Sequence, residues 1–312
     1  IHLYMGRRWR RRIYCQQKDD RSLIFGFGSR VNREDFIMRL AVMITMALGL
    51  VAGAAFAKTP YHDGTAEVIK PTDKDHPLGE IVSGYDFRKA MIRDVQDDDF
   101  ENPAMLVVDH GEELWGTVDG SAGKSLSQAF EGCAEVPLDV AGAVYPRFNN
   151  AAGKVISLEQ VINMCRETAM GAKPYKWESR DMLGITAYIR MQSRGSRVNV
   201  AVDGKASAAF ERGKKLYYQR VGQLDMSCAH CHEDNYGNYI RADMLSQGNI
   251  NGFPTYRLKW NGVGSTHRRF RGCMKNIRAK PLPYGHEDYV ALELYTAWRG
   301  NGLKVETPAY RN

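Results

Sequence analysis

The chain has 312 residues, a formal net charge of +7 and a sequence pI near 9.0. This length suggests two domains, and its 44% apolar and 25% charged residues are ordinary for a globular protein. Wholesale disorder, a collagen-like chain and a multi-span membrane protein are therefore excluded. A basic chain can bind nucleic acid, but residues 1–57 carry ten basic and four acidic residues, against 33 and 32 in residues 58–312. The two net charges are +6 and +1, so we predict no nucleic-acid partner.

The N-terminal region has the pattern of an export signal. A short charged start at Met38 is followed by an apolar run over residues 40–56 and by an A-x-A cleavage pattern that ends at Ala57. These are the three regions of a secretory signal peptide, whereas a membrane anchor would need a longer run and a basic flank after it. We therefore predict a signal peptide over residues 38–57, cleavage near Ala57, a periplasmic mature chain and no stable membrane insertion of that chain.

Residues 1–37 lie upstream of this signal. The segment begins with Ile1, is rich in arginine and has no periodic pattern. We interpret it as an extension upstream of a translation start at Met38, which need not be translated. The alternatives are a genuine cytoplasmic extension or a twin-arginine signal at Arg7-Arg8, although such a motif normally lies close to its apolar region.

Five cysteines remain in the predicted mature chain, an odd number for a compartment in which free thiols are uncommon. Two of them form the motif Cys228-Ala-His-Cys231-His232, which is the attachment pattern of a c-type haem. Its spacing allows both thiols to bond the porphyrin and His232 to ligate the iron. A zinc site would need another ligand at close spacing, and a thioredoxin-like dithiol would need a βαβ context. We therefore predict one covalently bound haem c.

An internal repeat with offsets of 102 to 108 residues runs through the mature chain. The helix expected at residues 206–219, before the haem motif, belongs to the second copy. Duplication explains an ordered series of matches better than coincidence among common helix residues. We predict a mainly α protein of two tandem cytochrome c-like domains, at residues 58–198 and 199–312. The matching segments are Gly111–Trp115 with Gly213–Tyr217, Tyr145-Pro146 with Phe253-Pro254, Cys165 with Cys273, and Ile185–Gly195 with Leu292–Gly302.

The first copy lacks the residues that attach haem. Leu126, Ala129 and Phe130 take the places of the two motif cysteines and the histidine, and none of these side chains can bond a porphyrin or ligate iron. We therefore predict that the first domain contains no haem. Cys133 and Cys165 are then expected to form a structural disulfide, because the export compartment favours pairing and only one other cysteine remains.

Cys273 is that remaining cysteine, and it lies in a basic segment. Positive charge lowers a thiol pKa and favours the thiolate, which is the nucleophilic and metal-binding form, and arginine suits contacts with small oxyanions. A buried apolar thiol or an intermolecular disulfide would be a simpler role for the cysteine, and a solvated face or docking patch a simpler role for the charges. The basic residues that crowd around the thiol in the sequence are Arg268, Arg269, Arg271, Lys275, Arg278 and Lys280, and several of them are expected to form such a face or patch.

The haem iron also needs a sixth ligand. Met244, Met274, His267 and His286 lie downstream of the haem motif, and methionine is the usual ligand in electron-transfer cytochromes c. A cysteine thiolate would instead lower the reduction potential strongly and give a poor ordinary carrier. The residues modestly favour Cys273 over the methionines.

Three segments together resemble the SoxA family, the catalytic cytochrome subunits of SoxAX complexes in bacterial thiosulfate oxidation. The resemblance covers essentially all of residues 80–312. Its most specific segments are residues 227–232 (SCAHCH), 268–279 (RRFRGCMKNIRA) and 295–311 (YTAWRGNGLKVETPAYR). In that family two cytochrome c domains lie in tandem, which is the fold predicted for this chain.

The resemblance implies a role for each candidate residue. His232 and Cys273 would be the axial ligands of the haem iron, Cys273 would carry a catalytic persulfide, and Arg269 would bind the substrate. Many family members carry a haem in both domains. Because this chain lacks the first motif, it is similar to the single-haem branch, in which a disulfide replaces that haem.

The implied activity is that of an L-cysteine S-thiosulfotransferase. Thiosulfate would be joined oxidatively to a cysteine of the SoxYZ carrier, and electrons would pass through haem c to a SoxX-type cytochrome subunit. A thiosulfate dehydrogenase that forms tetrathionate is one alternative, although such enzymes generally carry two haems on one chain. A plain periplasmic electron-transfer cytochrome c is the other, and it predicts a Met or His sixth ligand and tolerance of the loss of Cys273.

Overall fold

The computed structural model describes residues 66–312, so the predicted signal peptide (38–57) and upstream extension (1–37) lie outside the described residues. The described residues belong to one compact unit that spans residues 57–312. Helices make up most of their regular structure, and the strands are two or three residues long. The predicted mainly α class agrees with this content.

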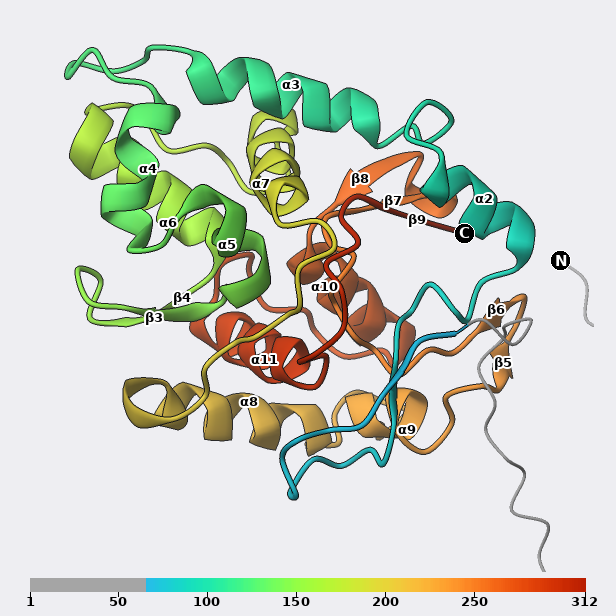
Figure 1. Ribbon diagram of the computed structural model, residues 1–312. Helices are drawn as coiled ribbons and strands as arrows, with labels where there is room; N and C mark the ends of the chain where they lie inside the picture. The colour runs from blue at the N-terminus through green and yellow to red at the C-terminus, as the bar shows by residue number, and fades with distance from the viewer. Residues whose placement is uncertain (1–65) are drawn as a thin grey trace, which may run out of the picture. The chain divides into compact units, whose positions relative to one another are not determined.

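Short hairpins link the helices in both halves of the described chain (Figure 1). The first half contains β1 (Val68–Ile69), β2 (Ile81–Val82), α2 (Ala90–Asp97), α3 (Met105–Gly116), α4 (Leu126–Ala134), α5 (Leu138–Val144), β3 (Arg147–Asn149), β4 (Lys154–Ile156), α6 (Leu158–Cys165), the π-helix η1 (Arg166–Met170) and α7 (Arg180–Gln192). The second half contains the 3₁₀ turn η2 (Gly204–Ala206), α8 (Ser207–Tyr218), α9 (Cys228–His232), β5 (Tyr239–Ile240), β6 (Asp243–Met244), β7 (Thr255–Arg257), the 3₁₀ turn η3 (Leu258–Trp260), β8 (Gly262–Gly264), α10 (Thr266–Asn276), α11 (Glu287–Trp298) and β9 (Ala309–Arg311).

Serine residues begin matching helices in the two halves. Ser125 and Ser227 stand immediately before α4 and α9, and Ser157 and Ser265 stand before α6 and α10. A serine in this position can accept a hydrogen bond from a free backbone N–H of the first turn, as Ser265 does from the Arg268 N–H at 3.1 Å. The two serine pairs are 102 and 108 residues apart, which are offsets of the predicted repeat.

Each half contains one close crossing of two helices. In the first half α3 packs on α7, and in the second half α8 packs on α11 (Figure 1). A Cβ atom at Gly111 would overlap the carbonyl of Gly184, and a Cβ atom at Gly213 would overlap the carbonyl of Ala291. Only glycine allows two backbones to approach this closely. Because Gly184 and Ala291 are 107 residues apart, the two crossings use equivalent positions of the repeat.

Two large apolar clusters lie mainly in the first and the second half respectively. The first cluster contains Leu126, Ala129 and Phe130, the residues that replace the haem-binding positions, and all three are buried. Trp115 packs edge-on against Phe130 at a ring-centroid distance of 5.4 Å. Apolar side chains therefore fill the region of the first half that corresponds to the haem motif. The second cluster includes Tyr217, Leu292, Tyr295 and Trp298.

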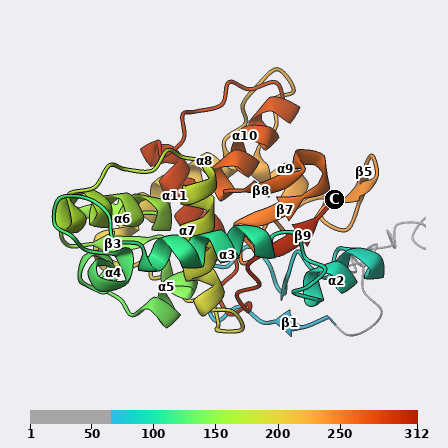
Figure 2. The same ribbon diagram turned by 90° about the horizontal axis from the view of Figure 1, so that it is seen from above.

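Hairpins position the helices that carry the repeated cysteines. β3 pairs with β4 before α6, and β7 pairs with β8 before α10, both in antiparallel register. β9 joins the other side of β7 in parallel, with Arg311 beside Arg257 (Figure 2). In the β5–β6 hairpin Tyr239 pairs with Met244. Strand β9 and the β5–β6 hairpin thus contribute further polar residues within the second half.

Strand β2 packs on the second half. The Val82 N–H donates to Gln247 Oε1 at 2.8 Å, and the Asn249 side chain donates to the Val82 carbonyl at 2.9 Å. Both interactions are buried. Residues from the predicted first domain (58–198) therefore contribute to the surroundings of the haem motif.

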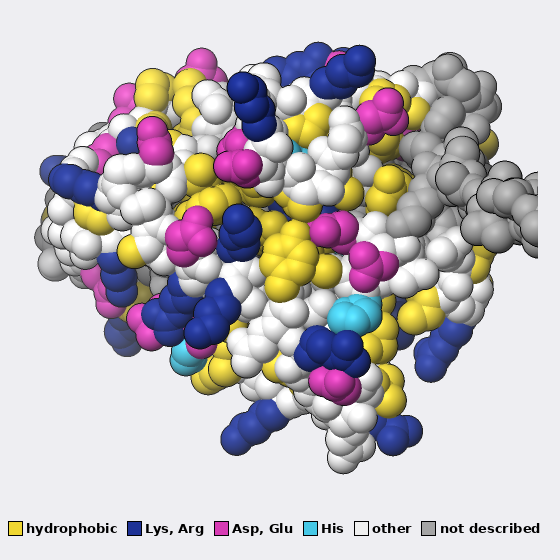
Figure 3. Space-filling view, turned by 90° about the horizontal axis from the view of Figure 1, so that it is seen from below, with side chains coloured by type: hydrophobic (Ala, Val, Ile, Leu, Met, Phe, Trp, Pro, Cys, Tyr) yellow, Lys and Arg dark blue, Asp and Glu magenta, His cyan; other side chains and the backbone are white. Residues whose placement is uncertain are grey.

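Within residues 66–312, no helix is both long and apolar enough to span a membrane. On the face shown in Figure 3, basic and acidic side chains are interspersed. This distribution agrees with the near-neutral charge of residues 58–312.

Candidate functional site

His232 is held in one orientation at the end of α9. Its Nδ1 lies 2.8 Å from the carbonyl oxygen of Ser246, and because a carbonyl only accepts hydrogen bonds, Nδ1 carries the proton. The following loop passes close to the ring, since Gly248 has a φ of +80° and a Cβ atom there would lie 2.8 Å from the His232 Cγ. Nε2 is thereby the ring nitrogen that remains to bind a metal ion, as in histidine ligands that a carbonyl supports.

Helix α10 brings the thiol of Cys273 to His232, and the two side chains hydrogen-bond to one another. Burial raises the pKa of Cys273, but the charges of Arg269 and Arg257 and the contact with His232 outweigh burial and lower the pKa to about 6. At neutral pH the protein therefore favours the thiolate, which is both a nucleophile and a metal ligand.

Two arginines from other parts of the chain join Arg269. Arg257 ends β7 and Arg88 lies just before α2, and the charge of Arg269 acts on both. Their side chains are 10% and 9% exposed, and they approach the carboxylate of Asp243 at 3.6 and 3.9 Å respectively. We call Arg88, Arg257 and Arg269 the arginine cluster. The sequence had predicted only Arg269 of these three.

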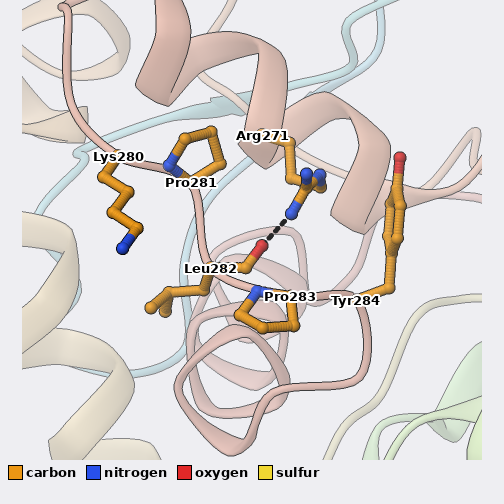
Figure 4. Close-up of a pocket in the computed structure, with 6 residues that line it drawn as sticks. All are labelled: Arg271, Lys280, Pro281, Leu282, Pro283 and Tyr284. Carbon is orange, nitrogen blue, oxygen red and sulfur yellow. Dashed lines mark hydrogen bonds between the residues drawn. The ribbon is translucent and has the colours of Figure 1, made fainter.

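Most of the six basic residues that are close to Cys273 in sequence are engaged elsewhere or exposed, and several of them were expected to be so. Arg268 lies over the Trp260 ring at 4.7 Å. Arg271 donates to the Leu282 carbonyl beside an open hollow of about 820 Å³ (Figure 4). The reason is that side chains along a helix point in different directions, and α10 ends before the last two basic residues. Lys275, Arg278 and Lys280 are exposed.

Two alternatives for the sixth haem ligand are engaged elsewhere. His267 is fully buried, with its Nε2 3.2 Å from Glu293 Oε2. His286 caps the start of α11 and accepts a hydrogen bond from a backbone N–H of that helix. Of the candidate ligands, Cys273 is the residue whose contact with His232 the structure records.

The residues around His232 fit a c-type haem. Burial, followed by the charges of Cys273 and Cys231, raises the pKa of Cys228 to about 12. Phe270 packs in the same apolar cluster as Cys228. Two thiols for covalent attachment, a histidine and a cysteine from two different helices, and apolar neighbours are the groups that this cofactor needs.

The predicted disulfide partners lie side by side in the first half. A hydrogen bond between the thiols of Cys133 and Cys165 lowers the pKa of Cys133 and raises that of Cys165. Cys165 is fully buried. Both are free thiols in the structure, so the disulfide between them stays a prediction, and their contact meets the first requirement for it.

Comparisons with known proteins establish the family. A family model described as SoxA/TsdA, cytochrome c domain, matches residues 110–198. The chain is similar to the L-cysteine S-thiosulfotransferase subunit SoxA of Pseudaminobacter salicylatoxidans, with 47% identity over 76% of this chain and 82% of that protein. It is 44% identical to the protein of the same name from Paracoccus pantotrophus, over 89% of this chain and 99% of that protein. The chain belongs to the SoxA family.

A solved SoxA-family structure has the same fold. The crystal structure of SoxXA from P. pantotrophus matches with a TM-score of 0.73 and 41% identity, covering 81% of this chain and 100% of the matched chain. The family model covers residues 110–198, in the half without a haem motif. The predicted cytochrome c-like fold is therefore supported in a part of the chain that contains no haem motif.

Sequence reasoning missed Arg88, Arg257 and Asp243. No motif or spacing links them to Cys273, because each reaches the site through the packing of a separate segment. Arg88 is brought there by the N-terminal segment that hydrogen-bonds to the second half. A pattern read along the chain could not have found this contact.

Proposed function

We propose that this chain is the SoxA-type subunit of an L-cysteine S-thiosulfotransferase, which oxidatively conjugates thiosulfate to a cysteine of a SoxYZ carrier. The observation that carries the proposal is the Cys273 thiol, held against His232 and favoured as a thiolate by Arg269 and Arg257. Relatives that are 44% and 47% identical to this chain bear the name of that activity. A plain electron carrier has no need of such a thiol.

We assign the chain one covalently bound haem c. Cys228 and Cys231 would form its thioether bonds, and His232 and Cys273 would ligate its iron. When bound, haem supplies one-electron oxidation and reduction, which side chains of this kind do not provide. The first half would hold no haem, since buried apolar side chains occupy the corresponding positions.

The side chains divide the work of the reaction. Arg269 would bind the oxygens of thiosulfate, because a guanidinium presents several N–H donors to an oxyanion. Cys273, modified as a persulfide, would be the sulfur centre at which thiosulfate reacts. In the overall reaction a bond forms between the sulfane sulfur and the carrier sulfur, the thiol proton goes to solvent, and two electrons leave.

The partners and location follow from the same proposal. A SoxX-type cytochrome subunit would accept the electrons, and the solved relative is itself a SoxXA structure. The predicted signal peptide at residues 38–57 would direct the chain to the periplasm, with cleavage near Ala57. There the mature chain would meet thiosulfate and the carrier.

The experiment that tests this function uses the holoprotein with its SoxX-type subunit, a SoxYZ carrier, thiosulfate and an oxidised cytochrome acceptor. The carrier should gain the mass of one thiosulfate group as the acceptor is reduced, with two electrons released per conjugate. Tetrathionate formed without any carrier would instead indicate the dehydrogenase. Haem that is reduced by other donors, with neither product formed, would indicate the plain carrier.

One mass measurement checks both the haem count and the disulfide. The mature protein, denatured and alkylated without reductant, should retain one haem and leave Cys133 and Cys165 unalkylated. Reduction should then expose both thiols to alkylation. In the folded protein, loss of the disulfide should lower the free energy of unfolding by about 3 kcal/mol, on the loop-entropy model. Two haems or none would contradict the assignment of cofactor, and alkylation of both cysteines without reductant would contradict the disulfide.

A further inference from the structure

We propose that Arg88 and Arg257 form a second oxyanion subsite beside Arg269, which binds the sulfonate end of thiosulfate, and that Asp243 is an internal anion that competes for it. The inference rests on the proposed function for the identity of the anion. It extends the substrate site to residues from three separate segments of the chain.

Arg257 presents its guanidinium between the C-terminal strand and the β5–β6 hairpin. Its Nε donates to the Asn312 carbonyl at 3.0 Å, which fixes one edge of the group. The Trp260 ring lies 5.4 Å away. Its Nη2 is 3.6 Å from Asp243 Oδ2, which is too long for a hydrogen bond. A positively charged edge of Arg257 is thus buried without a close anion.

Arg88 is constrained in a similar way from the opposite end of the sequence. Its Nη2 donates to the Met244 carbonyl, and its Nη1 is 3.9 Å from Asp243 Oδ1. Its Nε is buried and has no hydrogen-bond partner among the described residues. Buried donors without partners are rare, because each costs free energy. An incoming oxyanion would supply the missing acceptor.

The charges around the two arginines favour an anion. Burial and then the charge of Arg311 lower the pKa of Arg88 to about 10, and burial and then the charge of Arg269 lower that of Arg257 to about 10. Both therefore stay charged at neutral pH. Arg311 has a carboxylate of its own, Glu306, at 3.6 Å. Among the ion pairs of the described residues, Arg88 and Arg257 have only their long contacts to Asp243.

The chemistry of the subsite suits thiosulfate. The charge of Arg257 acts on the Cys273 thiol, and Arg269, beside the subsite, lies one helical turn before Cys273 in α10. Thiosulfate has a sulfane sulfur at one end and three oxygens at the other. Placed here, its oxygens would meet the arginine cluster while its sulfane sulfur faces Cys273.

Asp243 would compete with the substrate for Arg88 and Arg257. It lies in β6, its side chain is 41% exposed, and it approaches both Arg88 and Arg257. A carboxylate at this place lowers the net positive charge of the subsite before substrate arrives. Its long contacts make it a weak partner that a doubly charged anion can displace.

The test measures thiosulfate binding to the holoprotein by isothermal titration calorimetry, together with the KM for thiosulfate in the conjugation assay. Arg257→Gln and Arg88→Gln should each weaken binding and raise KM about tenfold, the effect expected for one lost hydrogen bond to a charged group. Asp243→Asn should tighten binding about threefold. Lys275→Gln is the matched control, since it removes one exposed positive charge from α10, and its binding should stay unchanged.

The opposite effects on thiosulfate binding expected for the arginine variants and for Asp243→Asn distinguish this subsite from a structural role. Loss of packing at the cluster would weaken binding in every variant, so weaker binding in Asp243→Asn would overturn the proposal, as would normal binding in both arginine variants. Arg257→Lys should recover part of the affinity because it restores the charge. If the wild type binds thiosulfate but modifies no carrier, the proposed function fails while the subsite stands. If it modifies the carrier and the arginine variants bind normally, only the subsite fails.

Discussion

Replacing Cys273 with serine should lower thiosulfate conjugation about a thousandfold or more, which is the size of effect expected for loss of a nucleophilic sulfur. A hydroxyl at this position can neither form a persulfide nor ionise near neutral pH. Its environment cannot compensate, because Arg269 and His232 act by stabilising the thiolate. The assay is the thiosulfate-dependent mass gain of the carrier, measured with the reduction of the acceptor.

Two readouts distinguish this loss from a damaged fold. The haem of the Cys273→Ser variant should remain covalently attached through Cys228 and Cys231, while its absorption spectrum changes because the thiolate donor is gone. The matched control is Cys165→Ser, which removes the equivalent thiol of the first half. It should lose stability but keep its turnover. Conjugation within a few fold of the wild type in Cys273→Ser would rule out the proposed chemistry.

Replacing Gly213 with alanine should destabilise the protein by about 3 kcal/mol or more, the upper range for overpacking. The added Cβ would overlap the Ala291 carbonyl and lie 3.0 Å from the Cβ of Tyr295. Because the obstacle is backbone, α8 and α11 must move apart. Urea unfolding followed by circular dichroism measures the loss. It should be accompanied by poorer haem retention, since α8 leads into the haem motif.

Gly132→Ala is the matched control for this effect. Gly132 lies in α4, and a Cβ atom there would meet nothing within 4 Å. Alanine should therefore stabilise that helix by about 0.5–1 kcal/mol. Gly111→Ala should behave like Gly213→Ala, because Gly111 makes the equivalent crossing in the first half. Equal stabilities for Gly213→Ala and Gly132→Ala would contradict the packing argument.

Features that depend on neighbouring residues could be predicted well. The helix expected at residues 206–219 is α8 at Ser207–Tyr218, and the haem motif forms the single short helix α9. The repeat was visible because matching helices of the two halves have the same small residue at their crossings, Gly111 and Gly213. These patterns succeed because helix periodicity, serine caps and motif spacing all act over a few residues.

The surroundings of the thiol could not be predicted in the same way. Closeness in sequence suggested that Arg268 and Arg271 would surround Cys273, yet these side chains lie against Trp260 and the Leu282 carbonyl. The position of a residue on a helix decides the direction of its side chain, so basic residues that are close in sequence do not all face one atom.

The sequence by itself predicted the chemistry proposed for this protein: an attached haem, a histidine ligand and one reactive cysteine, with a first half that lacks a haem motif. These predictions follow from residue types that are close in sequence, so they do not depend on how distant segments pack. Only the tertiary structure decided which charges act on that cysteine. Arg88, Arg257 and Asp243 come from an N-terminal segment, a strand and a hairpin, and they meet because burial of the apolar clusters packs those segments together.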